Sequence, residues 1–139
     1  MPSMSRSEVL VLTTRAEPRA LEEIEGILRQ AWSENVHVPD GVRMQFGIAV
    51  REIAANIIKH AAGGRQVQIR MEMRVFPSEM RVEFIDDGEA MRADLSAAGM
   101  PDDMAESGRG LALAQTALGR LSYRRNSVNH WTLVSKPFS

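Results

Sequence analysis

The chain has 139 residues, about the length of one domain, and a domain of this size can hold a core without metal or disulfide staples. Hydrophobic residues make up 44% and charged residues 25%, which excludes a disordered chain, and the low aromatic share of 5% predicts an aliphatic core with methionine filling its gaps. The absence of cysteine excludes disulfides, thiolate zinc sites and thiol catalysis. The net charge of −1 lacks the basic excess of a typical nucleic-acid binder, so we expect no nucleic-acid partner.

Targeting and membrane signals are missing from the sequence. No apolar run approaches the roughly 20 residues that cross a bilayer. The segment Met1–Arg6 is short and polar, with no signal-peptide core behind it. No internal repeat or linker divides the chain. We therefore expect a single domain over residues 1–139, located in the cytoplasm without membrane contact.

The first elements are a strand and a helix. Four consecutive apolar residues within Glu8–Thr13 predict a strand buried on both faces. Thr14 and Glu17 have the spacing of a capping box, with Pro18 tolerated in a first helical turn. The helix that follows is expected to end near Trp32. Its apolar stripe consists of Leu21, Ile24, Leu28 and Ala31.

A second helix and a hairpin follow. Apolar spacing predicts a helix from Val42, stopped by the glycine pair at 63–64. Polar and apolar residues alternate strictly over Gln66–Val75, which predicts a half-buried strand. Pro77–Glu79 is typical of a turn, and alternation resumes over Met80–Asp86, so the two strands are expected to form an antiparallel hairpin.

The last third of the chain begins with a segment that lacks a period. Residues 89–107 are predicted to be a mobile, functional loop. Leu111 and Leu118 mark a short helix, closed by Gly119 in the position after the helix that suits glycine. A final hairpin turns across Asn126–Asn129. The order βα–α–ββ–loop–α–ββ predicts an α+β, two-layer sandwich, with helices on one face of a mainly antiparallel sheet.

The first chemical feature is a polar row on the second helix. Glu52, Asn56 and His60 are four residues apart, so they form one row beside the apolar stripe. The alternative is a solvated helix face with an incidental carboxamide. Glu52 and His60 alone are too few donors for a metal cluster, since His37 and His130 are expected in a loop and at a strand end.

The second feature is the acidic end of the predicted strand Met80–Asp86. A carboxylate such as Asp86 at a strand end can accept a hydrogen bond from the exocyclic amine of a base, and Gly88 would let the base come close. The alternative is an acidic turn that closes a strand, which is very common.

The third feature is a glycine-rich segment ahead of the last helix. It consists of Ser107, Gly108, Arg109, Gly110 and Leu111. Glycines before a helix N-terminus leave backbone N–H groups free to hold phosphate oxygens. The alternative is a flexible hinge, because the segment matches neither common glycine-rich phosphate signature.

Together and in this order, the three features resemble the nucleotide site of the GHKL ATPase superfamily, over about residues 8–136. Within it, the compact size and the Glu-x-x-x-Asn-x-x-x-His row resemble the anti-sigma factor serine kinases of bacterial partner-switching systems. The resemblance implies the Bergerat-type ATP-binding fold, ATP and Mg²⁺ as cofactors, and a homodimer.

The resemblance also implies roles for single residues. Asn56 would be a ligand of Mg²⁺, and Glu52 would be the general base that orients the attacking hydroxyl. His60 would lie near the rim of the site. Asp86 would bind the adenine amine, with Gly88 allowing close approach of the base.

The glycine-rich segment would contact the phosphates. Gly108, Arg109 and Gly110 would wrap the triphosphate, flanked by Ser107 and Leu111, with residues 89–107 as a lid.

The sequence departs from the pattern at two positions. Ala90 stands where the superfamily has glycine, and its small side chain is expected to admit the nucleotide. Glu106 stands where some relatives place an arginine beside the γ-phosphate, a purpose that a carboxylate cannot serve.

Three functions compete at this point. The first is a protein serine kinase and anti-sigma factor that phosphorylates a small STAS-type anti-anti-sigma partner and otherwise holds a sigma factor or another target. The second is a nucleotide-gated binding module with little transferase activity, which would have no need for Glu52. The third is the catalytic part of a sensor histidine kinase, which needs a phosphoacceptor helix pair; about seven residues precede the first predicted strand, so that acceptor would have to lie on another chain.

Overall fold

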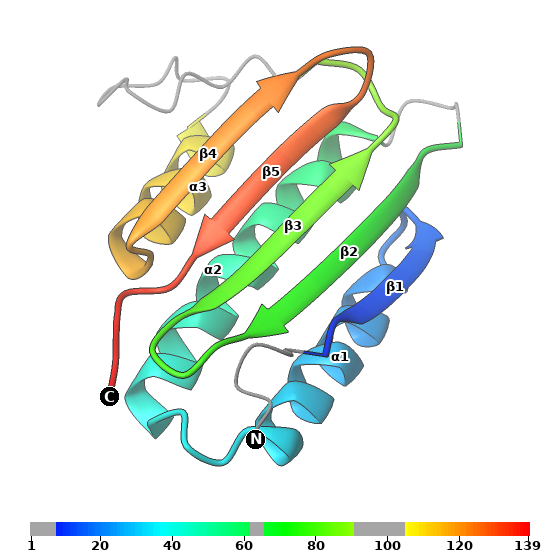
Figure 1. The fold of residues 1–139 in the computed structure, drawn as a ribbon. Helices are drawn as coiled ribbons and strands as arrows, with labels where there is room; N and C mark the ends of the chain where they lie inside the picture. The colour runs from blue at the N-terminus through cyan, green and yellow to red at the C-terminus, as the bar shows by residue number, and fades with distance from the viewer. Residues whose placement is uncertain (1–7, 62–65, 91–104) are drawn as a thin grey trace.

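The computed structural model describes residues 8–61, 66–90 and 105–139, and residues 105–108 by their backbone alone. A sheet forms one layer, and the helices lie together on one of its faces (Figure 1). The elements are β1 (Leu10–Arg15), α1 (Ala20–Glu34), α2 (Asp40–His60), β2 (Gln68–Val75), β3 (Met80–Asp86), α3 (Ala105–Ala117), β4 (Arg120–Arg125) and β5 (Asn129–Val134).

The five strands of the described chain follow the order β1-β2-β3-β5-β4, and every neighbouring pair is antiparallel. The alternation predicted for the first hairpin is observed, because the side chains of Ile69, Met71 and Met73 are buried while their neighbours face solvent or are half-buried. The β2–β3 turn closes with Phe76 N–H donating to Glu79 O at 2.8 Å. The expected α+β sandwich is confirmed, with β3 at the centre of the sheet.

The helices supply the other half of the core. On α1 the buried residues are Ala20, Ile24, Leu28 and Ala31, close to the predicted stripe. α2 crosses the middle of the sheet, and α3 lies behind β4 and β5 (Figure 1). The core is largely aliphatic, with three fully buried methionines, but Trp131 and Phe84 are also fully buried at its centre.

The first strand differs from its prediction. β1 is an edge strand, paired with β2 alone, and it is not buried on both faces. Val9 is 38% exposed and Val11 41% exposed. Val11 lies opposite Glu72 rather than opposite the buried Met71 or Met73, so its side chain is on the other face of the sheet, away from the helices. A run of four apolar residues therefore does not distinguish an edge strand from a central strand that is buried on both faces.

The capping box predicted at Thr14 and Glu17 is wrong. Thr14 lies inside β1, and α1 begins only at Ala20, after the turn that contains Pro18. The hydroxyl of Thr14 donates to Glu23 Oε1 at 2.6 Å instead. A strand-to-helix hydrogen bond replaces the local cap.

Some boundaries also move. α2 begins at Asp40, two residues before the predicted start, and the glycines at 63–64 lie outside the described residues. Most of the predicted loop, residues 91–104, also lies outside them. The turn of the last hairpin is shorter than predicted, since Asn129 is the first residue of β5. Ser127, with φ 85°, supplies the left-handed conformation of that turn.

Gly119 is needed for space rather than for a left-handed cap. Its backbone does not adopt a positive φ. A Cβ atom at Gly119 would lie 2.8 Å from the carbonyl oxygen of Ser135, since the junction from α3 to β4 runs directly against the end of β5. Gly119 N–H donates to Val134 O at 2.9 Å and fixes this approach.

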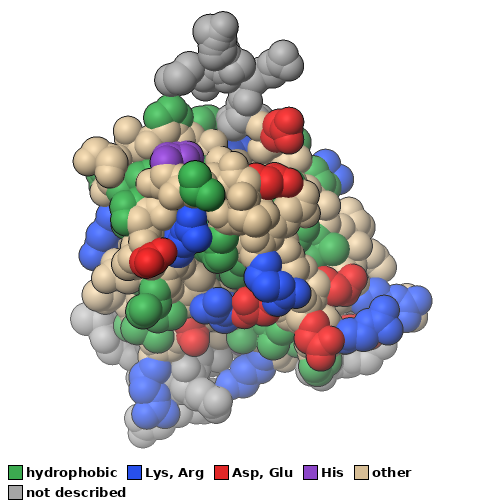
Figure 2. Space-filling view, turned by 90° about the horizontal axis from the view of Figure 1, so that it is seen from below, with side chains coloured by type: hydrophobic (Ala, Val, Ile, Leu, Met, Phe, Trp, Pro, Cys, Tyr) green, Lys and Arg blue, Asp and Glu red, His purple; other side chains and the backbone are tan. Residues whose placement is uncertain are grey.

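Figure 2 views the end of the molecule where the β2–β3 turn and the α1–α2 connection lie. Basic and acidic side chains are interspersed there, and hydrophobic side chains are scattered among them (Figure 2). This face therefore shows no basic stripe of the kind that follows a phosphate backbone. Within the described residues, no helix combines the length and the apolar composition needed to cross a membrane.

Candidate functional site

The polar row of α2 runs from a half-buried to an exposed position. Glu52 is half-buried, Asn56 is 5% exposed, and His60 lies at the exposed last residue of the helix. The neighbouring α2 residues Ile53 and Ile57 are in the core, so the row lies beside the core as expected. A buried carboxamide between two ionisable groups is unusual on a merely solvated helix face.

Gly110 of α3 lies directly against this row. A Cβ atom built on Gly110 would lie 2.5 Å from Glu52 Oε1 and 4.0 Å from Asn56 Nδ2. The missing side chain is therefore what lets α3 approach the carboxylate. Asn56 Nδ2 is itself buried and has no hydrogen-bond partner among the described residues.

Asp86 ends β3 as a buried carboxylate with two unequal oxygens. The residue is 4% exposed. Its Oδ1 accepts hydrogen bonds from the Gly88 N–H at 3.0 Å and from Asn129 Nδ2 at 2.8 Å. Its Oδ2 is buried and has no partner among the described residues. Burial raises the pKa of Asp86 above its usual value, although both hydrogen bonds oppose the shift.

Gly88 completes the turn after β3. A Cβ atom at this position would lie 3.1 Å from Asp86 Oδ1 and 3.4 Å from Val67 Cγ1. A side chain here would therefore crowd Asp86 Oδ1 and Val67, and glycine avoids this contact.

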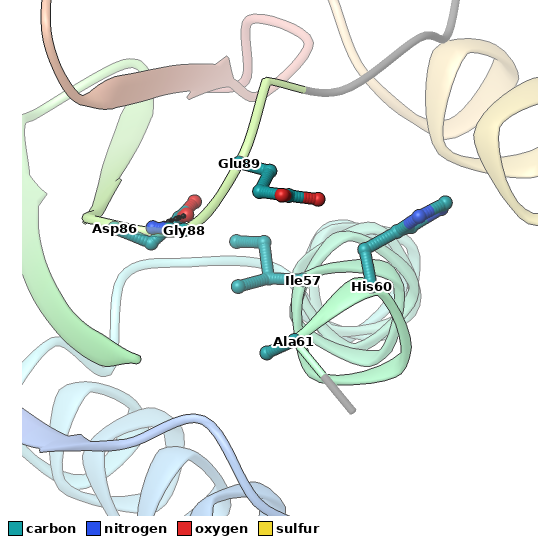
Figure 3. Close-up of a pocket in the computed structure, with 6 residues that line it drawn as sticks. All are labelled: Ile57, His60, Ala61, Asp86, Gly88 and Glu89. Carbon is teal, nitrogen blue, oxygen red and sulfur yellow. Dashed lines mark hydrogen bonds between the residues drawn. The ribbon is translucent and has the colours of Figure 1, made fainter. Parts of the chain in front are cut away.

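A small pocket separates the end of β3 from the end of α2. Asp86, Gly88 and Glu89 line one side, and three residues of α2 and its C-cap line the other (Figure 3). The α2 side consists of Ile57, His60 and Ala61. The pocket has a volume of about 10 Å³, room for a single water molecule, so a base can be seated only if the walls move apart. Burial, with a smaller effect from Lys59, lowers the pKa of His60, which favours the neutral imidazole at this rim.

The β4–β5 hairpin contributes three residues that the sequence does not indicate. Asn129 Nδ2 donates to Asp86 and also to Glu89 O at 2.8 Å. The Oδ1 of Asn129 accepts from the Tyr123 hydroxyl and from Arg125 Nη1. Arg125 Nη1 donates to Gly88 O as well, at 2.9 Å. These bonds tie the turn that carries Asp86 to the hairpin.

Comparison with family models connects this site to a known class. The model described as the histidine kinase-like ATPase domain matches residues 14–136, most of the chain. The chain belongs to this family. The superfamily expected from the motifs is thereby confirmed, and with it ATP binding and kinase-like chemistry. A comparison with curated proteins finds no match.

The glycine-rich segment of this ATPase domain does not precede the helix. Residues 107–111 lie inside α3, which begins at Ala105, so the prediction of a loop before the helix is wrong at this point. A helix start there is reasonable, because Glu106 stands in the first turn, where an acidic residue favours the helix dipole. Free backbone N–H groups are those of the first turn, around Ser107 and Gly108, since an α-helix leaves its first four N–H groups unpaired.

The other members of the segment differ in their surroundings. Arg109 is exposed, whereas Leu111 is 4% exposed and belongs to the hydrophobic core. Leu111 therefore anchors α3 in the described structure. Ala90, one of the two departures from the family pattern, is exposed beyond the pocket and does not obstruct it.

In this ATPase domain, a magnesium ion could be held by few protein ligands together with the phosphates of the nucleotide. The described residues contain no group of three His, Cys, Asp or Glu side chains that could hold a metal by themselves. Asn56 offers a buried amide beside the carboxylate of Glu52, and its Oδ1 is the atom that would ligate the ion, since the unpartnered Nδ2 is a donor and cannot. Mg²⁺ needs few protein ligands, since substrate phosphates and waters complete its octahedron.

Proposed function

We propose that this ATPase domain is a protein serine kinase that also acts as an anti-sigma factor in partner switching. The observation that carries the proposal is the pairing of a half-buried carboxylate, Glu52, with the buried amide of Asn56, both under Gly110. A domain that only bound nucleotide would have no use for an acid at this position.

The base would be bound at the end of β3. Asp86 Oδ2, buried and without a partner among the described residues, is an acceptor suited to the adenine amine. Gly88 adds no side chain to the pocket, so the walls need to move apart less to seat the ring. Asn56 would hold Mg²⁺, which when bound neutralises phosphate charge and orients the phosphates.

Transfer itself would depend on Glu52. The hydroxyl oxygen of a partner serine attacks the γ-phosphorus, an O–P bond forms, and the bond from phosphorus to the β–γ bridging oxygen breaks, so ADP leaves. Glu52 orients the hydroxyl and accepts its proton. Catalysis by positioning suits a site built on the rigid helix α2.

The partners follow from the same proposal. The serine would belong to a small STAS-type anti-anti-sigma protein, and its phosphorylation would release the domain to hold a sigma factor or another regulated target. The active species would be a cytoplasmic homodimer. These partners are supported by the resemblance of the Glu52–Asn56–His60 row to the anti-sigma kinases.

The test is a transfer assay with [γ-³²P]ATP, Mg²⁺ and the STAS-like protein encoded nearest to this chain. Glu52→Gln should leave ATP binding nearly intact and slow transfer by about 10²-fold, the usual contribution of a positioned base. Asn56→Ala should depress both binding and transfer. Glu22→Gln changes an exposed acid of α1 and serves as the matched control, with transfer unchanged.

The chemistry of the label separates the competing functions. Phosphoserine on the partner survives acid, whereas phosphohistidine does not. Acid-stable label on the partner is the expected result. A domain that binds ATP well but labels no cognate partner would instead be a nucleotide-gated binding module, and acid-labile label on a histidine would make it the catalytic part of a histidine kinase.

A further inference from the structure

Asn129 is a buried polar side chain at the seam between β3 and β5. It is 1% exposed and lies opposite Asp86 in the antiparallel register of the two strands. Its amide forms side-chain hydrogen bonds in both directions across the sheet. They reach Asp86 and the turn after it on one side, and the β4 strand on the other.

The orientation of this amide is determined by its neighbours. Arg125 Nη1 is a donor and lies 2.9 Å from Asn129 Oδ1. The hydroxyl of Tyr123 donates to the same oxygen. A guanidinium cannot accept a hydrogen bond, so the oxygen of the amide must face Arg125 and the nitrogen must face Asp86.

The orientation of the Asn129 amide also fixes the orientation of the Asp86 carboxylate. Asp86 Oδ1 receives the two donors, Asn129 Nδ2 and the Gly88 N–H, which together hold the plane of the carboxyl group. Oδ2 is then the oxygen left without a partner among the described residues. The residue that determines which oxygen remains available lies 43 positions away in the sequence.

We propose that Asn129, oriented by Arg125 and Tyr123, is a positioning residue that directs Asp86 Oδ2 toward the 6-amino group of adenine and so sets base selectivity. This inference rests on the proposed nucleotide site. It adds the side chains that hold the acceptor in place, and it makes the β4–β5 hairpin part of the recognition apparatus.

The test compares ATP with purine riboside triphosphate, which lacks the 6-amino group, by equilibrium binding. One hydrogen bond to a charged group should make the wild-type chain prefer ATP by about tenfold or more. Asp86→Asn should bring this ratio close to one. Asn129→Ala should reduce it by at least about threefold, because the carboxylate is no longer held.

Two further variants test the orientation. Asn129→Asp keeps the shape but sets a carboxylate against Asp86, and it should reduce the ratio at least as far as Asn129→Ala. Arg125→Leu removes the donor that orients the amide; Arg125 is exposed, so folding should survive even where an Asn129 variant does not fold. Asn126→Ala, at an exposed asparagine in the turn of the same hairpin, is the matched control and should keep the wild-type ratio.

A merely structural role predicts a different pattern. Asn129→Ala and Arg125→Leu would then weaken both triphosphates equally and keep the wild-type ratio, which would overturn the inference while leaving the nucleotide site intact. A wild-type chain that bound neither triphosphate would overturn the proposed function and the inference with it. Reduced ratios in these variants, with a wild-type ratio in Asn126→Ala, would support the inference.

Discussion

The carboxylate of Asp86 is buried, and one of its oxygens has no hydrogen-bond partner among the described residues. Burial disfavours the ionised form of the group. The raised pKa means that the folded chain holds this proton to a higher pH than the unfolded chain does. The neighbouring charges, Asp87 and Arg125, act in opposite directions on it. Keeping the ionised carboxylate of Asp86 buried therefore costs stability.

A pH series tests this cost. Because the folded pKa is raised, the stability contributed by protonated Asp86 is complete below the ordinary value of 3.8 and is lost as pH rises through the folded pKa. The free energy of unfolding of wild type relative to Asp86→Asn should therefore fall as pH rises from about 4 through the folded pKa, and then level off. Urea unfolding at several pH values measures it. A difference that stays constant with pH would contradict the prediction.

A substitution at Gly110 tests whether phosphate transfer depends on the position of the Glu52 carboxylate. In Gly110→Ala the new Cβ meets the end of a flexible side chain, Glu52 Oε1, so the carboxylate should swing away. Helix propensity favours alanine over glycine by about 1 kcal/mol, so stability should not fall. Phosphate transfer should fall by about tenfold or more, and by more than ATP affinity does.

The control is Gly26→Ala on α1, where the nearest atom that a Cβ would meet in the described part of the chain is Arg29 Nη2, at 3.8 Å. It should gain similar stability and keep full transfer. Equal transfer in the Gly110 and Gly26 variants would show that the carboxylate of Glu52 need not stay where it is.

The candidate site residues differ in whether the sequence of their own segment is enough to predict them. Glu52, Asn56 and Asp86 could be predicted as candidates, because a helical spacing and a strand end place each of them within its own segment. Asn129 could not, because its contact with Asp86 depends on which strand lies beside β3 and in what register. No local pattern in the sequence carries that information.

At the scale of elements, the junction from α3 to β4 depends on one close backbone approach. In Gly119→Ala the Cβ would lie 2.8 Å from Ser135 O and 3.2 Å from Ser135 C, both backbone atoms that cannot rotate aside. We expect a loss of about 1–3 kcal/mol in the free energy of unfolding.

The comparison is Gly41→Ala in the first turn of α2, where a Cβ would meet no atom of the described residues within 4 Å. Urea unfolding of both variants measures the difference. Gly41→Ala should be neutral or stabilising. Similar unfolding midpoints for the two variants would mean that the junction is looser than its geometry indicates.

The helices and strands were largely predictable from the sequence, whereas their end residues and their exposure were less so. Strict alternation identified β2 and β3, since a period of two residues is characteristic of a strand with one buried face. The exposure of Val11 was missed because an edge position depends on strand order. The start of α1 was missed because Thr14 bonds to Glu23 rather than capping a helix. In α3, the glycines did not prevent helix formation.

For the whole molecule, nucleotide binding should stabilise the fold. At an ATP·Mg²⁺ concentration of about 100 times Kd, the free energy of unfolding should rise by about 2.7 kcal/mol. For a domain of this length that corresponds to a rise in Tm of roughly 8 °C. A thermal melt measures it. Asp86→Asn should show a much smaller rise at the same concentration, and an equal rise would place the base elsewhere.

The strand order also has a consequence for how the chain folds. β2–β3 and β4–β5 are hairpins of consecutive strands, whose short loops close quickly. The β3–β5 seam joins the hairpins, and its Asp86–Asn129 hydrogen bond spans 43 residues. Because longer loops cost more entropy to close, we expect this seam to form after the hairpins. Binding competence would then appear as a late kinetic event, following the secondary structure signal during refolding.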